Sequence, residues 1–109
     1  MLTESQACEL LRLARAAAEA DVTGRPPPSP LTDPPFDQKL GLFVTLKVDG
    51  KLRGCMGTFN AERPIGEMVV RMTRTSLQDP RFAFDRVQPE ELPRLKIELS
   101  ILSPMHRTY

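Results

Sequence analysis

The chain has few of the residues that build metal centres and nucleophilic relays. Its 109 residues include one histidine, two cysteines, one tyrosine and no tryptophan. Cys8, Cys55 and His106 are too few to form a tetrahedral zinc site without help from carboxylates. The sequence also lacks a Walker loop, a dinucleotide-binding glycine fingerprint and a serine-centred elbow. It therefore predicts no metal and no cofactor, and it excludes the enzyme classes that depend on those motifs.

An excess of one charge and a long apolar run are also missing. Fifteen Lys and Arg residues against 14 Asp and Glu give a formal charge of +1 at pH 7, which argues against a strong general attraction to nucleic acid or anionic membranes. No apolar run approaches the ~20 residues of a membrane span. The first 20 residues lack the basic start of a signal peptide and carry charges throughout. We therefore expect a cytoplasmic protein with reduced cysteines and no membrane partner.

The first third of the chain predicts a helix followed by a stiff loop. Thr3 and Gln6 form a capping box, and apolar residues then recur at helical spacing. Cys8 lies beside this stripe, and we interpret it as a small buried thiol. Six prolines in residues 21–36 exclude helix and inner strand. This Pro-rich loop is predicted to be a semi-rigid connector, and a polyproline II ligand is the alternative.

The stretch FVTLKVDGKLRGCMG, residues 43–57, predicts a β-hairpin. Asp49-Gly50 is a strong signal for a type I′ turn, because both central residues of that turn need positive φ. Downstream, Pro64 predicts the start of a helix that runs to about Leu77, and a single helical turn is expected at residues 89–92. Residues 96–101 alternate polar with apolar side chains, which predicts a third strand. Residues 105–109 show no pattern and are expected to fray.

These elements predict one α+β domain over residues 1–109. Its order is helix, β-hairpin, helix, strand, with two helices packed on one face of a small antiparallel or mixed sheet. A sheet of three strands leaves an edge, or the dry face of the last strand, that could favour self-association.

Three motifs resemble the signature of the AMMECR domain family. They are Phe43 to Gly57 with its Leu-Arg-Gly-Cys-Met-Gly run, Asp79-Pro80-Arg81-Phe82, and residues 95–104 ending in Leu-Ser-Pro. The three occur in the family's order and spacing, with a proline-initiated helix between the first two.

The resemblance implies an α+β fold, a cytosolic setting and, in bacteria and archaea, radical S-adenosylmethionine and Memo-type proteins as partners. It supplies no reaction, because function resides in sites rather than in folds. Family domains are much longer than this chain, so the resemblance covers about the first half of the domain and suggests a truncated or split member.

Cys55 is the first candidate for chemistry. With Arg53 and backbone amides nearby, a lowered thiol pKa would give a nucleophile or a metal contact. The alternative is a structural cysteine in a hairpin whose glycines accommodate a bulge. No base is evident, since His106 lies in the tail.

A second cluster comprises Arg53, Gly54, Gly57, Asp79 and Arg81. Asp79 could pair with an arginine and fix the turn after the helix, or the arginines could hold a phosphate or carboxylate. The glycines would let a ligand or another backbone come close.

The function predicted first is therefore a binding or assembly module that docks a protein partner or a small anionic ligand here. An enzyme or enzyme subunit with Cys55 as its working thiol is the alternative. A nucleic-acid-associated factor ranks third.

Overall fold

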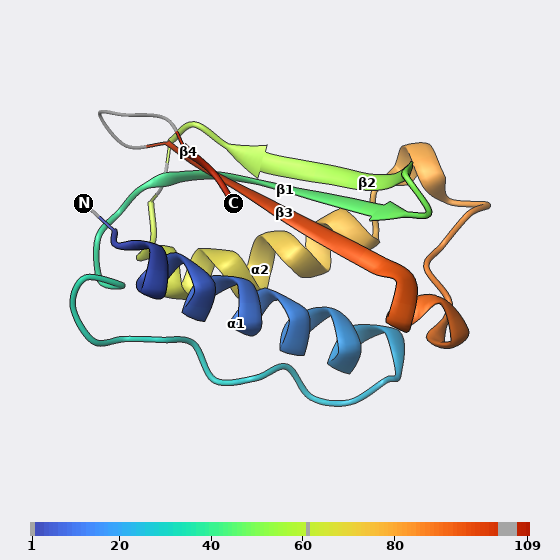
Figure 1. The fold of residues 1–109 in the computed structure, drawn as a ribbon, viewed down its shortest axis with the longest axis horizontal. Coiled ribbons are helices and arrows are strands. Elements are labelled where there is room, and N and C mark those ends of the chain that lie inside the picture. The colour runs from blue at the N-terminus through green and yellow to red at the C-terminus, as the bar shows by residue number, and fades with distance from the viewer. Residues whose placement is uncertain (1, 61, 103–106) are drawn as a thin grey trace.

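The computed structural model describes residues 2–60, 62–102 and 107–109, and it confirms the α+β prediction. The elements are α1 (Glu4–Val22), β1 (Gly41–Val48), β2 (Lys51–Thr58), α2 (Ile65–Leu77), η1 (Pro80–Phe82), η2 (Pro89–Arg94), β3 (Leu95–Leu102) and β4 (Arg107–Thr108). Both long helices lie on the same side of the sheet (Figure 1). Among the described residues, neither helix is long and apolar enough to cross a membrane.

The sheet is antiparallel throughout, with the strand order β2-β1-β3-β4. The hairpin turn is as predicted, because Asp49 and Gly50 have φ values of 53° and 78°. β1 pairs with β3 over the whole length of both strands, from Gly41 opposite Leu102 to Val48 opposite Leu95. The two central strands of the sheet, β1 and β3, are therefore neighbours in space although they are far apart in sequence.

The core lies between the sheet and the helices. β1 alternates strictly, so that Leu42, Val44, Leu46 and Val48 are buried under the helices. In β3, Leu99 and Ile101 are also buried, which shows that the helices cover the dry face of that strand. In the part of the chain that the structure describes, no helix lies over the opposite face of the sheet (Figure 1), and we call this face the open face.

The capping box is formed as predicted, with Thr3 and Gln6 each bonding the other's backbone amide. Cys8, however, is exposed, so its prediction as a buried thiol is wrong. The buried stripe of α1 runs through Ala7, Leu10 and Ala14, and Cys8 is turned about 100° from Ala7 around the helix, away from the core.

The C-terminal end also differs from the prediction. Arg107–Thr108 form a fourth strand, and Tyr109 exchanges two backbone hydrogen bonds of 2.6 Å with Leu99. The predicted fraying of residues 105–109 is therefore wrong for 107–109. His106, the predicted tail histidine, lies outside the described residues.

The Pro-rich loop connects α1 to β1 along the helices. Its end is fastened to the start of α2, because the carbonyls of Phe36 and Gln38 accept hydrogen bonds from the amides of Gly66 and Ile65. Phe36 is buried in the core. These contacts hold the loop against the core. The loop begins after Val22 rather than at residue 21, because α1 runs to Val22 and the first proline of the loop is Pro26.

Candidate functional site

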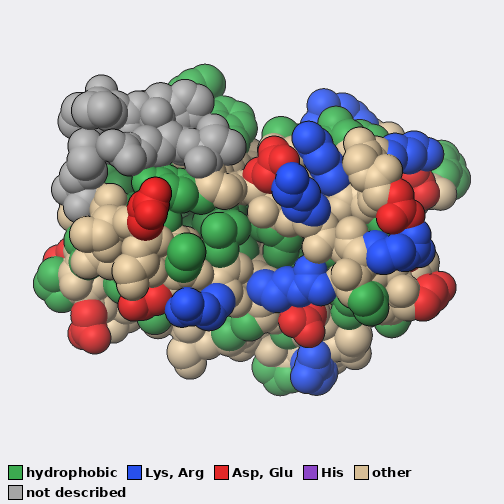
Figure 2. Space-filling model, viewed as in Figure 1, with side chains coloured by type: hydrophobic (Ala, Val, Ile, Leu, Met, Phe, Trp, Pro, Cys, Tyr) green, Lys and Arg blue, Asp and Glu red, His purple; other side chains and the backbone are tan. Residues whose placement is uncertain are grey.

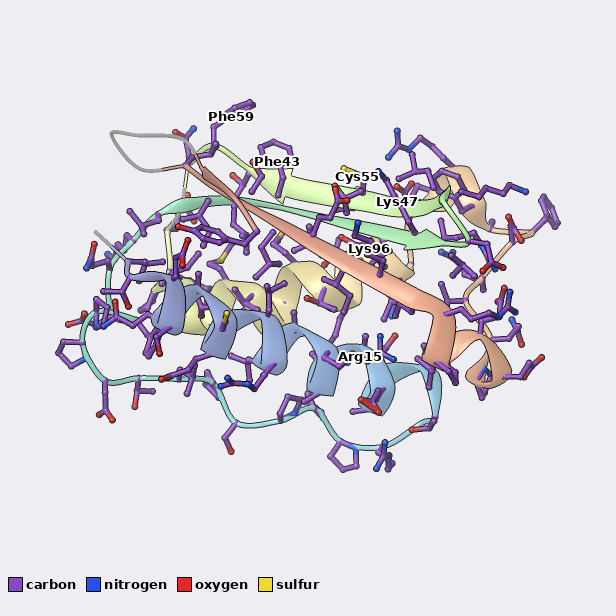
Figure 3. The ribbon with its side chains drawn as sticks, in the orientation of Figure 1. Arg15, Phe43, Lys47, Cys55, Phe59 and Lys96 are labelled. Carbon is purple, nitrogen blue, oxygen red and sulfur yellow. The ribbon has the colours of Figure 1, made fainter. Side chains whose placement is uncertain are left out.

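Cys55 lies on the open face of the sheet, opposite Thr45 of β1. Its thiol is half-buried, and the sulfur is 3.4 Å from the Thr45 hydroxyl. Figure 3 shows Cys55 on the side of the sheet that faces away from the helices, together with Phe43, Lys47, Phe59 and Lys96. Cys55, the thiol that the sequence singled out, therefore lies on the face of the sheet that does not pack against the hydrophobic core.

A β-bulge sets this orientation. β2 pairs Gly54 with Leu46 but Leu52 with Lys47, so Arg53 is an extra residue between two ladder positions. The extra residue switches which residues of β2 face each side of the sheet. As a result, Cys55 lies on the open face and Gly54 faces α2. A Cβ at position 54 would overlap the backbone carbonyl of Ser76 in α2.

Arg53 is directed away from the Cys55 thiol, into the segment between η1 and η2. Its guanidinium makes a two-pronged contact with Glu91 at 2.6 and 3.0 Å. It also donates to the carbonyls of Asp85 and Arg86, each at 2.9 Å. The side chain is 7% exposed, and all three of its nitrogens donate to protein oxygens. This geometry favours a structural role for Arg53.

Asp79 and Arg81 hold the outer edge of β2 at Cys55. The Asp79 carboxylate accepts a hydrogen bond of 3.1 Å from the Cys55 amide. Nη2 of Arg81 donates to the Cys55 carbonyl at 3.0 Å and to Asp79 at 2.6 Å. Because β2 is an edge strand, its outward peptide groups need such partners. We call this arrangement the Asp79–Arg81 clasp.

The clasp shifts the pKa values of both of its charged side chains. Hydrogen bonds from Arg81 hold the pKa of Asp79 well below its ordinary range, against the opposing effect of burial, and the backbone amides of Arg81 and Cys55 act in the same direction. The same pairing raises the pKa of Arg81. Asp79 is 1% exposed, whereas the Arg81 side chain is 61% exposed. The clasp therefore buries an anion and presents its cation to solvent.

Aromatic and basic side chains occupy the two ends of the open face. Phe43 and Phe59 make an edge-to-face contact with ring centroids 5.0 Å apart. Gly57 lies under this pair, since a Cβ there would overlap the Phe43 side chain and the Leu42 carbonyl. Gly57 thus leaves the space beside it that the Phe43 ring occupies.

At the other end, Lys47 of β1 lies directly opposite Lys96 of β3. Both contact Glu98, at 3.6 and 3.9 Å. Two cations share one anion, so this end of the open face is basic. Figure 2 shows several basic side chains, with acidic ones among them, over this end of the sheet.

Sequence reasoning missed part of this surface. It singled out Cys55, Asp79 and Arg81, but not the aromatic pair, the two lysines or Glu91. The alternation of β1 could have revealed two of these residues. Phe43 and Lys47, with Thr45 between them, alternate with the buried residues of this strand and therefore share its other face. The described residues hold no cluster of three or more potential metal ligands.

The fold and this site define a class: an α+β domain whose antiparallel sheet is covered by helices on one face and carries a clasped Cys-containing hairpin on the other. The sequence model of the AMMECR1 family matches residues 11–109, and the chain belongs to that family.

Relatives support the assignment. The chain is 38% identical over 94 residues to protein TV1384 of Thermoplasma volcanium, covering 84% of this chain and 46% of the relative. A Methanothermobacter thermautotrophicus protein is 35% identical over 107 residues, covering 94% of this chain and 54% of the relative. The crystal structure of protein PH0010 from Pyrococcus horikoshii superposes with a TM-score of 0.73 at 36% identity, covering 88% of this chain and 50% of that one. The chain thus spans about half the length of the relatives it matches.

Proposed function

We propose that this chain is a binding or assembly module that docks a protein partner on the open face of its sheet, beside Cys55. The observation that carries the proposal is Phe59. This ring is 76% exposed, although it lies against Phe43 on the open face. A large apolar side chain held in place at the surface is typical of interface residues, and aromatic residues dominate binding energy at interfaces.

The charges indicate the chemistry of the partner. Lys47 and Lys96 share the carboxylate of Glu98, and Arg81 exposes its guanidinium at the neighbouring edge. A partner with an apolar side chain for the aromatic end and a carboxylate for the basic end would complement the open face. Arg53 contributes indirectly, because its contacts hold the bulge that orients Cys55.

The family resemblance nominates the partners. Radical S-adenosylmethionine and Memo-type proteins are the first to test, and a cytoplasmic location with reduced cysteines is part of the same proposal. Both cysteines are free thiols in the structure.

The test is a calorimetric titration of the purified chain with the radical S-adenosylmethionine protein and the Memo-type protein of its own organism. Phe59→Ala should weaken binding by about tenfold or more, as expected for an aromatic anchor. Phe84→Ala is the matched control, because Phe84 is a fully exposed phenylalanine in the segment after η1. Equal effects of the two variants, or no binding of either protein, would rule out docking on the open face.

A reactive thiol at Cys55 is the second candidate function. It is favoured by the fixed backbone of Cys55, whose amide and carbonyl are both held by the clasp, and by the placement of the sulfur on the open face. The rate of alkylation of Cys55 as a function of pH distinguishes the two. A midpoint well below the ~8.5 of a free thiol would favour the enzyme, whereas protection until the chain unfolds would favour the module.

A further inference from the structure

The first half of the Pro-rich loop has a sequence that restricts its own backbone. Residues 25–30 read Arg-Pro-Pro-Pro-Ser-Pro. Each proline ring fixes its φ at about −65°, and each residue that precedes a proline is kept out of the helical region. Together these restrictions favour the polyproline II conformation. In the described part of the chain, residues 25–32 form no helix or strand, and their carbonyls accept no hydrogen bond.

The exposure of the side chains along this loop repeats every three residues. Pro28 and Leu31 are half-buried. The residues around these two are exposed, namely Pro26, Pro27, Ser29, Pro30, Thr32 and Asp33. Three residues per turn is the period of the polyproline II helix. One ridge of that helix therefore lies against the protein, and its other two ridges are presented to solvent.

Both ends of the stretch are held by the two long helices. At its start, the Arg25 amide donates a hydrogen bond of 2.7 Å to the Ala20 carbonyl of α1. At its end, the Leu31 carbonyl lies so close to α2 that a Cβ on Gly66 would overlap it. Figure 1 shows the loop running alongside α1, on the side of that helix away from the sheet. The stretch is therefore ordered before any partner binds, which reduces the entropy lost on binding.

We propose that residues 25–30 are the ligand of a partner domain with an aromatic-lined groove of the SH3 type. Such grooves bind polyproline II segments with two prolines three residues apart. A three-sided helix that lies in a groove contacts it with two ridges and turns the third away. Pro27 and Pro30 have the required spacing on one exposed ridge, and the residues before them, Pro26 and Ser29, lie on the other. Pro28, on the third ridge, faces the protein.

The groups that the stretch exposes indicate the chemistry of the groove. Its free carbonyls require hydrogen-bond donors, and tryptophan N–H and tyrosine O–H groups supply such donors beside an apolar ring. The exposed Arg25 would pair with an acidic side chain at the rim of the groove. A second copy of this chain fits poorly as the occupant, because the sequence has no tryptophan and only one tyrosine.

The test is an NMR titration of the isotope-labelled 109-residue chain with a panel of SH3 domains that differ in sequence preference. Binding should shift the amide signals of Ser29 and Leu31 and leave that of Phe59 in place. Pro30→Ala should weaken the tightest complex about tenfold or more, because it removes a proline from an exposed ridge. Pro28→Ala is the matched control and should leave the Kd nearly unchanged, since it makes the same change on the ridge that faces the protein.

Three results would each overturn the proposal: no binding by any domain of the panel, equal losses in the two variants, or shifts on the open face instead of at residues 25–31. Shifts of the Ser29 signal on concentrating the chain alone would identify a second copy as the occupant and would also overturn it. The unchanged signals of core residues in the same spectra show that both variants are folded. Phe59→Ala should leave the SH3 affinity unchanged, so this inference and the docking of a partner on the open face can fail separately.

Discussion

The carboxylate of Asp79 accepts a hydrogen bond of 3.1 Å from the amide of Cys55, a residue 24 positions earlier in the chain. The contact joins the segment after α2 to the edge of the sheet. Arg86 reinforces the same junction, because it donates to the carbonyls of Leu77 and Asp79 at 2.9 and 3.0 Å. The orientation of Cys55 therefore depends on the end of α2 as much as on the hairpin.

Asp79→Ala should reduce the free energy of unfolding by about 2–4 kcal/mol, because it leaves the Cys55 amide and the amide of Arg81 without their acceptor. Asp79→Asn should cost less, since the amide oxygen can still accept one of these bonds. Urea unfolding followed by circular dichroism measures both. Glu90→Ala, an exposed acidic residue, is the control. A loss in Asp79→Ala no larger than in the control would show that the clasp does not stabilise the edge.

The Arg53–Glu91 pair predicts a specific acid sensitivity. Hydrogen bonds from Arg53, assisted by the Gln88 amide, lower the pKa of Glu91 from its ordinary 4.5 to about 2. A carboxyl group with a depressed folded-state pKa stabilises the fold above its unfolded pKa, and that contribution is lost as the pH falls through the folded value. The melting temperature should therefore fall between pH 4.5 and pH 2.

Glu91→Gln checks the source of this dependence. The variant should melt lower at neutral pH, because Arg53 loses its charged partner, yet its melting temperature should vary less across the same acid range. Asp79 also titrates below its ordinary range, so some acid sensitivity remains in the variant. A profile parallel to that of the unmodified chain would contradict the role given to Glu91.

What the sequence could predict was local. The capping box at Thr3 and the turn at Asp49-Gly50 depend on neighbouring residues, and both are found as expected. β4 depends on pairing with β3 rather than on its own two residues, so no local pattern announces it. The prediction that Cys8 is buried was wrong because this residue lies beside the apolar stripe of α1 and not within it, so its side chain is exposed.

In the candidate site, too, the local motifs were predictable from the sequence and the long-range contacts were not. The motif around Cys55 and the Asp-Pro-Arg-Phe turn were found from sequence, but which charges pair was not. Arg53 binds Glu91, 38 residues away, rather than Asp79. The bulge at Arg53 decides this, because it turns the guanidinium away from Cys55 and leaves Arg81 to pair with Asp79.

Gly54→Ala tests the packing of the hairpin on α2. A Cβ at this position would overlap the carbonyl oxygen of Ser76, a backbone atom that cannot rotate away. We expect a loss of about 1–3 kcal/mol in the free energy of unfolding, as for other overpacked positions. Gly24→Ala is a useful comparison, because a Cβ there meets nothing within 4 Å and only the positive φ of 73° is strained. A smaller loss at position 54 than at position 24 would show that the sheet and α2 can move apart freely.

The two cysteines should react at different rates, with Cys8 ahead of Cys55. Cys8 is exposed on α1, whereas Cys55 is half-buried, with its sulfur 3.4 Å from the Thr45 hydroxyl. Limited alkylation at pH 7.5, roughly one unit below the ordinary thiol pKa, should therefore modify Cys8 first, as peptide mass spectrometry would show. Thr45→Val should leave the rate at Cys8 unchanged and alter only that at Cys55. If Cys55 reacted faster than the exposed Cys8, accessibility could not explain the order, and an activated thiol on the open face would become the better account of this site.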